Sequence, residues 1–128
     1  MQRKDAVFEG DENQDTRHFG AFSDGSLVGV VTIFPAPMPD DPSRPGTWQL
    51  RGMATAPEVR GAGCGARLLE ACHRHVQDCQ GELLWCNARV PAQGFYERHG
   101  WTPTGAVFVI PTAGPHIRMY IALDRAQP

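Results

Sequence analysis

The sequence has no long hydrophobic run and no marked excess of charge of either sign. Its longest apolar segment, residues 27–34, is interrupted by Gly29 and Thr32 and is far shorter than the ~20 residues that a helix needs to cross a bilayer. Twelve basic and fourteen acidic side chains give a formal net charge of −2, which does not favour a nucleic-acid or membrane-surface partner. The first fifteen residues are polar and lack the apolar core of a signal peptide, so we expect a cytoplasmic protein.

Cysteine is scarce, and its spacing is not that of a metal site. Cys64, Cys72, Cys79 and Cys86 form no C-x-x-C pair and no C-x-x-C-H motif, which argues against a structural zinc or a c-type haem. We therefore expect no metal. In a protein without a signal peptide the four thiols are expected to be reduced and structural, with Cys72 and Cys79 on one face of a helix.

The chain reads as one domain of the α+β class. Residues 1–16 are acidic and are expected to be irregular. Two β-rich runs around Asp24-Gly25 then predict a hairpin, and five prolines in residues 35–46 predict a loop. Residues 48–55 predict a strand, in which Gly52 indicates a bulge or a close backbone contact.

The second half of the chain alternates helices and strands. Apolar residues with helical spacing predict a helix that begins at Gly63 and ends at Gly81. Residues 82–87 predict a short buried strand, and Pro91 opens a second short helix. Two further strands are expected near residues 106–110 and 117–123. The order β-β-β-α-β-α-β-β predicts a mixed, mostly antiparallel sheet flanked by helices.

The glycine-rich segment VRGAGCGARLLEA, residues 59–71, leads directly into the first predicted helix. It is not a P-loop, because no Gly-Lys-Ser/Thr follows the glycines. Gly61, Gly63 and Ala66 satisfy the dinucleotide-binding pattern G-x-G-x-x-G/A. That fingerprint needs a tight strand-to-helix turn and an acidic residue after the next strand, whereas here residues 56–60 intervene and the next strand ends in Asn87. A flexible loop without a ligand is the remaining alternative, and the entropic cost of three glycines counts against it.

A third interpretation begins at Arg60. The segment Arg60-Gly-Ala-Gly-Cys-Gly65 matches the pattern Q/R-x-x-G-x-G/A and resembles the acyl-CoA pyrophosphate loop of the GNAT superfamily of N-acyltransferases. The resemblance covers roughly residues 18–123 and implies a three-layer α/β/α fold with acetyl-CoA as co-substrate. A helix N-terminus with glycines before it suits a diphosphate, because unpaired N–H groups and the positive end of the dipole face the ligand. The residues implied at the pyrophosphate are Arg60, Gly61, Ala62, Gly63, Cys64, Gly65 and Ala66.

Two further motifs support the resemblance. WQLRGMATAPEV, residues 48–59, resembles the family's strand along the pantetheine arm, which implies that Met53, Ala54 and Thr55 bind the arm through their backbone. NARVPAQGFYERHGW, residues 87–101, resembles the second signature, in which Asn87 bonds the pantetheine or orients the loop; a plain asparagine at a strand end is the alternative.

The resemblance also implies the catalytic groups. Tyr96 occupies the position that the family uses as general acid for the leaving CoA thiolate, and a phenol with a pKa near 10 is suited to that transfer. The alternative is a buried aromatic side chain under the sheet. GPHIRMYIAL, residues 114–123, resembles the closing strand of a bacterial GNAT subgroup and makes His116 a candidate base, with a polar edge residue as the alternative.

The family pattern is abbreviated at the N-terminus, where helices usually form the wall of the acceptor site. The interpretation is therefore an N-acetyltransferase that acts on a primary amine by direct attack, or alternatively a non-catalytic acyl-CoA-binding module. The edge of the hairpin at residues 17–23 is expected to lack its usual neighbouring strand, and Phe19, Val30 and Ile33 are expected to have less cover than a helix normally gives. We accordingly expect a homodimer in which the second subunit supplies part of the acceptor wall.

Overall fold

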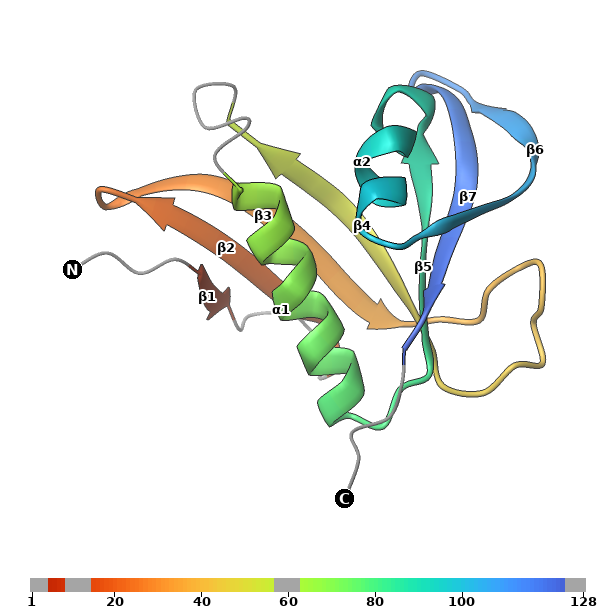
Figure 1. The fold of residues 1–128 in the computed structure, drawn as a ribbon, viewed down its shortest axis with the longest axis horizontal. Helices are drawn as coiled ribbons and strands as arrows, with labels where there is room; N and C mark the ends of the chain where they lie inside the picture. Colours follow the sequence, from red (N-terminus) through yellow and green to blue (C-terminus); the bar gives the residue numbers. More distant parts are fainter. Residues whose placement is uncertain (1–4, 9–14, 57–62, 124–128) are drawn as a thin grey trace.

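The protein is built on one seven-stranded sheet, seen here in a computed structural model that describes residues 5–8, 15–56 and 63–123. The strand order is β1-β2-β3-β4-β5-β7-β6, and in the described residues β4 and β5 form the parallel pair within an otherwise antiparallel sheet (Figure 1). The α+β class with a mixed, mostly antiparallel sheet is thereby confirmed. The elements are β1 (Asp5–Phe8), β2 (Arg17–Ser23), β3 (Ser26–Pro35), β4 (Thr47–Thr55), α1 (Cys64–Asp78), β5 (Leu83–Arg89), a 3₁₀ turn (Val90–Ala92), α2 (Gln93–Arg98), β6 (Thr102–Ile110) and β7 (Gly114–Ala122).

Strand β1 corrects the expectation that residues 1–16 are irregular. Its backbone pairs antiparallel with β2, from Asp5 opposite Ala21 to Phe8 opposite His18. The edge of the hairpin at Arg17–Ser23 is therefore covered, against our expectation. A short strand that joins an existing hairpin gains its hydrogen bonds from the neighbour and needs no apolar periodicity of its own, which is why the sequence pattern did not reveal it.

Both helices pack on the same face of the sheet. The apolar side of α1 contributes Leu68, Leu69, Cys72 and Val76 to a core that also contains Tyr96 of α2. Phe19 and Ile33, for which we expected reduced cover, are buried in this core, and Val30 is half-buried. The opposite face carries the loop of residues 36–46, so in the described part of the chain this loop, not a helix, forms the second flanking layer.

The end of α1 differs in detail from the prediction that Gly81 terminates it. The helix ends at Asp78, and the left-handed residue after it is Gln80, with φ of 65°. Gly81 donates its N–H to the carbonyl of Val76 at 2.7 Å, and a Cβ at this position would collide with the Val76 side chain. Gly81 is thus required for close packing, not for its backbone angle.

All four cysteines are free thiols, and three of them are buried. Cys79 is the exception: it lies exposed at the C-cap of α1, with its sulfur 3.5 Å from Nε2 of His75. The expectation that Cys79 shares the apolar face of Cys72 is therefore wrong, because α1 ends at Asp78 and Cys79 lies exposed at its C-cap.

The buried thiols predict a loss of stability in alkaline solution. Burial raises the pKa of Cys72 and of Cys86 from 9.0 to about 12, so the folded protein keeps two protons that the unfolded chain releases. This stabilisation is complete below pH 9 and is lost as the pH rises towards 12. The free energy of unfolding should fall by about 1 kcal/mol per thiol for each pH unit in that range.

Urea denaturation at pH 8 and pH 10 measures this effect. The variant Cys72→Val is the control, since it should show a smaller pH dependence than the wild type. An equal pH dependence in the two proteins would contradict the assignment to Cys72.

Candidate active site

The candidate site lies where β4 and β5 separate. The parallel ladder joins residues Thr47 to Leu50 with Leu83 to Cys86 and stops there, while both strands continue (Figure 1). Residues 51–55 of β4 therefore make no ladder with β5, and their backbone groups on that side are open to a ligand. We call this the fork. It brings Met53, Ala54 and Thr55, the residues implied at the pantetheine arm, to one strand edge.

A bulge at Gly52 shapes the β4 side of the fork. Thr32 of β3 pairs with Arg51 and Val30 pairs with Ala54, so two residues of β4 stand opposite the single residue between them in β3. Gly52 has φ of +70°, and no atom lies within 4 Å of where its Cβ would be. Glycine is needed here for its backbone angle, which confirms the bulge predicted from the sequence.

The N-terminus of α1 has the features of an anion-binding site. Its N-cap is Gly63, in the left-handed conformation with φ of 84°, and no side chain caps the first turn. Arg67 donates its N–H to the carbonyl of Gly63 at 3.0 Å, which leaves the N–H groups of Cys64, Gly65 and Ala66 without a helical partner. The first turn holds no acidic residue, so an anion would meet no repulsion there. Arg60, Gly61 and Ala62 lie outside the described residues.

The side chain of Cys64 points away from this anion site. It is buried against β3, where a Cβ on Gly29 would lie 2.7 Å from its sulfur. Burial raises the pKa of the Cys64 thiol, and Arg67 offsets only part of the rise. Its position at the helix end does not lower this pKa, because desolvation outweighs the favourable charge. Cys64 can therefore serve a ligand only through its backbone N–H.

Gly65 has a packing role that the sequence did not reveal. A Cβ at this position would lie 2.9 Å from Cζ of Phe95 on α2. The glycine thus allows the start of α1 to approach the second helix closely. A side chain at Gly65 would disturb the contact between the helices whether or not a ligand binds.

Tyr96 reaches the closed end of the fork from α2. Only 5% of its surface is exposed, and its hydroxyl hydrogen-bonds with the thiol of Cys86, the last β5 residue paired with β4. Its ring packs on Trp101 and on Phe95, with centroids 5.0 Å and 5.3 Å away. Desolvation, reinforced by Cys86, raises the pKa of the phenol above its usual range, so the phenol stays protonated in the folded protein.

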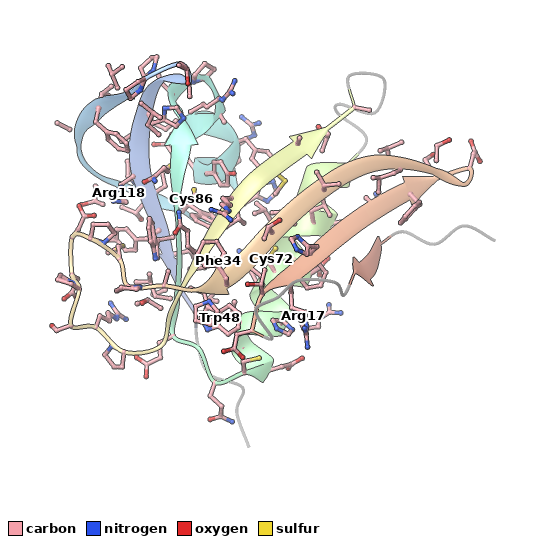
Figure 2. All side chains as sticks on the ribbon, turned by 180° about the vertical axis from the view of Figure 1, so that it is seen from behind. Arg17, Phe34, Trp48, Cys72, Cys86 and Arg118 are labelled. Atoms are coloured by element: carbon pink, nitrogen blue, oxygen red, sulfur yellow. The ribbon has the colours of Figure 1, made fainter. Side chains whose placement is uncertain are left out.

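Asn87 and His116 lie on the sheet face opposite the helices. Cys86 and Ala88 enter the core, so Asn87 between them is directed to the other face, as His116 and Arg118 are in β7. Figure 2 views the molecule from this side, with α1 behind the strands. Nδ1 of His116 lies 2.7 Å from the carbonyl oxygen of Gly114, to which it must donate, so the neutral ring keeps a lone pair on Nε2. His116 is 5% exposed and its ring stacks on Phe108.

Arg118 was not foreseen as part of the site. It stands opposite Asn87 in the β5–β7 register, donates from Nη1 to Oδ1 of Asn87, and places Nε 2.7 Å from Oδ1 of Asp40. The alternation of β7 could have placed Arg118 on the same face as His116. Nothing in the sequence of the proline-rich loop pointed to Asp40.

Neither a metal centre nor a membrane-spanning helix is found in the described residues. No group of three or more His, Cys, Asp or Glu side chains there is placed to hold a metal ion. None of the described helices is long and apolar enough to span a membrane.

Comparison with known proteins identifies the family. A model of the Acetyltransferase (GNAT) family matches residues 2–101. The N-acetyltransferase YitI of Bacillus subtilis, named as uncharacterized, is 32% identical over 116 residues, which are 91% of this chain and 77% of that protein.

Solved structures share the fold at lower identity. The ribosomal-protein-S18-alanine N-acetyltransferase of Escherichia coli superposes with a TM-score of 0.69 at 18% identity, over 91% of this chain and 74% of that one. An aminoglycoside 6′-N-acetyltransferase in complex with coenzyme A superposes with a TM-score of 0.71 at 16% identity, over 91% of this chain and 77% of that one. The chain belongs to the GNAT family of acetyltransferases, as the resemblance in its sequence predicted.

Proposed function

We propose that the protein transfers the acetyl group of acetyl-CoA to a primary amine by direct attack in a ternary complex. The observation that carries the proposal is the fork of β4 and β5 beside the uncapped N-terminus of α1. The fork offers a strand edge to the thioester arm, and the helix start offers N–H groups to the diphosphate. Acetyl-CoA needs both features together. The similar fold of an aminoglycoside acetyltransferase complexed with coenzyme A supports the same ligand here.

Each part of acetyl-CoA has a proposed place. The pyrophosphate binds at residues 60–66, through the N–H groups at the start of α1 and a charge-assisted contact from Arg60. The pantetheine arm lies along the backbone of Met53, Ala54 and Thr55 and contacts Asn87. A backbone N–H of this strand polarises the thioester carbonyl and stabilises the oxyanion that forms on attack.

The reaction needs one proton acceptor and one proton donor. The neutral amine attacks the carbonyl carbon and forms a C–N bond; the tetrahedral intermediate then collapses, and the C–S bond breaks. Tyr96 gives its phenolic proton to the departing CoA thiolate, and Nε2 of His116 takes a proton from the nitrogen. A covalent intermediate on Cys64 is not part of the proposal, because its buried sulfur faces β3.

A screen of primary amines with the purified protein tests the proposal. The protein is incubated with acetyl-CoA and amino acids, diamines or short peptides, and mass spectrometry follows acetylated product and CoA. An acetylated amine formed with one equivalent of CoA is the expected result. Binding of acetyl-CoA without transfer to any amine would favour the non-catalytic module, and binding of NAD without CoA would favour a nucleotide-binding protein.

The extent of the domain, its compartment and its oligomeric state are also proposed. We propose a single catalytic domain over residues 1–128, in the cytoplasm. The homodimer also stays a prediction, although the hairpin edge no longer supports it, because β1 covers that edge. Its remaining support is at the edge strand β6, where Val107 and Val109 are 54% and 71% exposed and a second copy could cover them. Analytical sedimentation would test it.

A further inference from the structure

We propose that Arg118 is a positioning residue, which joins the loop of residues 36–46 to Asn87 and fixes the amide of Asn87 as a hydrogen-bond donor toward the pantetheine arm. The inference rests on the proposed function, since it assigns the arm to the fork. It concerns residues on the sheet face opposite the helices, labelled in part in Figure 2.

The guanidinium of Arg118 is held by four groups from different parts of the chain. It donates to Asp40 of the loop, with Nε 2.7 Å from Oδ1, and to Oδ1 of Asn87 on β5. It also lies over two aromatic rings, with its Cζ 5.5 Å from the ring centroid of Trp85 and 5.3 Å from that of Phe108. Contacts in two hydrogen-bonding directions and with two rings fix both the position and the plane of the group.

This arrangement decides which way the amide of Asn87 is turned. A guanidinium has only donors, so the Asn87 atom that it meets must be the oxygen. The amide nitrogen then keeps both of its protons, and within the described residues no acceptor takes them. Asn87 is half-buried and follows directly on Cys86, where the fork begins. Its nitrogen can therefore donate to a carbonyl of the pantetheine arm, while its oxygen is held by Arg118.

The loop at the other end of the link is itself anchored. Trp85 Nε1 and Thr47 Oγ1 both donate to the carbonyl of Ala36, at 3.1 Å and 2.8 Å. Met38 is buried in a small cluster with Leu83 and Trp85. The loop is thus held on the sheet beside the fork, and Asp40 presents its carboxylate to Arg118 from a fixed base. Asp40 thus keeps the guanidinium oriented, and the oriented guanidinium in turn fixes the amide of Asn87.

Calorimetric titration of the full chain tests this assignment with two probes. CoA carries the pantetheine arm, and 3′-phospho-ADP is the part of CoA that lacks it. Arg118→Gln should weaken CoA binding by about three- to tenfold, the effect of one hydrogen bond, while the Kd for 3′-phospho-ADP stays unchanged. The affinity of Arg118→Lys for CoA should fall between those of the wild type and Arg118→Gln. An ammonium group can bond one partner but cannot reproduce the planar guanidinium.

Asn87→Asp is the second variant. It removes the N–H donor of Asn87 without removing the bond to Arg118. The carboxylate keeps its bond to Arg118 but has no N–H, so CoA binding should weaken as in Arg118→Gln. Arg74→Gln is the matched control, because Arg74 pairs with Glu70 on the exposed side of α1 and should bind CoA normally. Thermal unfolding of each variant verifies that it folds.

The possible outcomes are distinct. A folded Arg118→Gln or Asn87→Asp protein with wild-type affinity for CoA would overturn the inference alone. Equal weakening of both probes would also overturn it, because a general disturbance of the site would then explain the effect. A wild-type protein that binds neither probe would overturn the proposed function, and the inference with it.

Discussion

Replacement of Gly63 by valine is expected to abolish acetyl-CoA binding. Gly63 is the N-cap of α1 and has φ of 84°, a conformation that a β-branched residue adopts only with strain of about 1–3 kcal/mol. Valine would therefore draw the backbone towards a negative φ and turn the N–H groups of Cys64 and Gly65 away from a common anion. Since these groups and the helix dipole supply the proposed pyrophosphate site, the loss should exceed that from any single side chain.

Asparagine at the same position is the matched control. It tolerates positive φ better than any other common side chain besides glycine, and the space where a Cβ would go is open, with Nη1 of Arg67 as the nearest atom at 3.8 Å. Gly63→Asn should thus bind CoA far better than Gly63→Val in calorimetry. If the valine variant is folded and binds CoA with wild-type affinity, the pyrophosphate does not bind at this helix start.

The structure changes the expected effect of replacing a second glycine, Gly65, by valine. From the sequence alone, valine at Gly65 would be expected to block the ligand in the same way as valine at Gly63. A Cβ at Gly65 would instead meet the ring of Phe95 at 2.9 Å, so this change would force α1 and α2 apart. Loss of CoA binding in such a variant would reflect disturbed helix packing. A substitution at Gly63 therefore tests the pyrophosphate site more directly.

The parts of the site that were predictable are those in which one residue type is dictated by backbone geometry. Gly52 in a strand and Gly63 before a helix both have positive φ, and the sequence marked both positions.

Features that depend on contacts between distant segments were not predictable in this way. β1 forms because β2 offers it a free edge, and Asp40 meets Arg118 across 78 positions of sequence. Neither pairing leaves a local pattern, since the residues involved would be ordinary in a loop or at a surface. The same holds for Gly65, which must be a glycine because the ring of Phe95 on α2 lies next to where its Cβ would be.

Tyr96→Phe is expected to lower kcat by about 10²–10³-fold while the affinity for acetyl-CoA stays nearly unchanged, the size of effect that loss of a general acid produces. The phenol is buried beside Cys86 at the closed end of the fork, and its raised pKa keeps it protonated throughout the neutral range. A raised pKa also means that Tyr96 itself should add no loss of kcat as the pH rises from 7 to 9. Single-turnover measurements of CoA release across this range would provide the rate of the chemical step.

Cys86→Ala distinguishes proton donation by Tyr96 from a merely structural role. It removes the hydrogen-bonding partner of the phenol and part of the same core, but leaves the proton donor in place. Because a thiol is a weak hydrogen-bonding group, the phenol should remain near the fork, and kcat should stay within several-fold of the wild type. A large loss of kcat in both variants would mean that packing around Tyr96 controls the rate. Wild-type kcat in a folded Tyr96→Phe protein would exclude the phenol as the acid, and the CoA thiolate would then have to take its proton from another group at the fork or leave unprotonated.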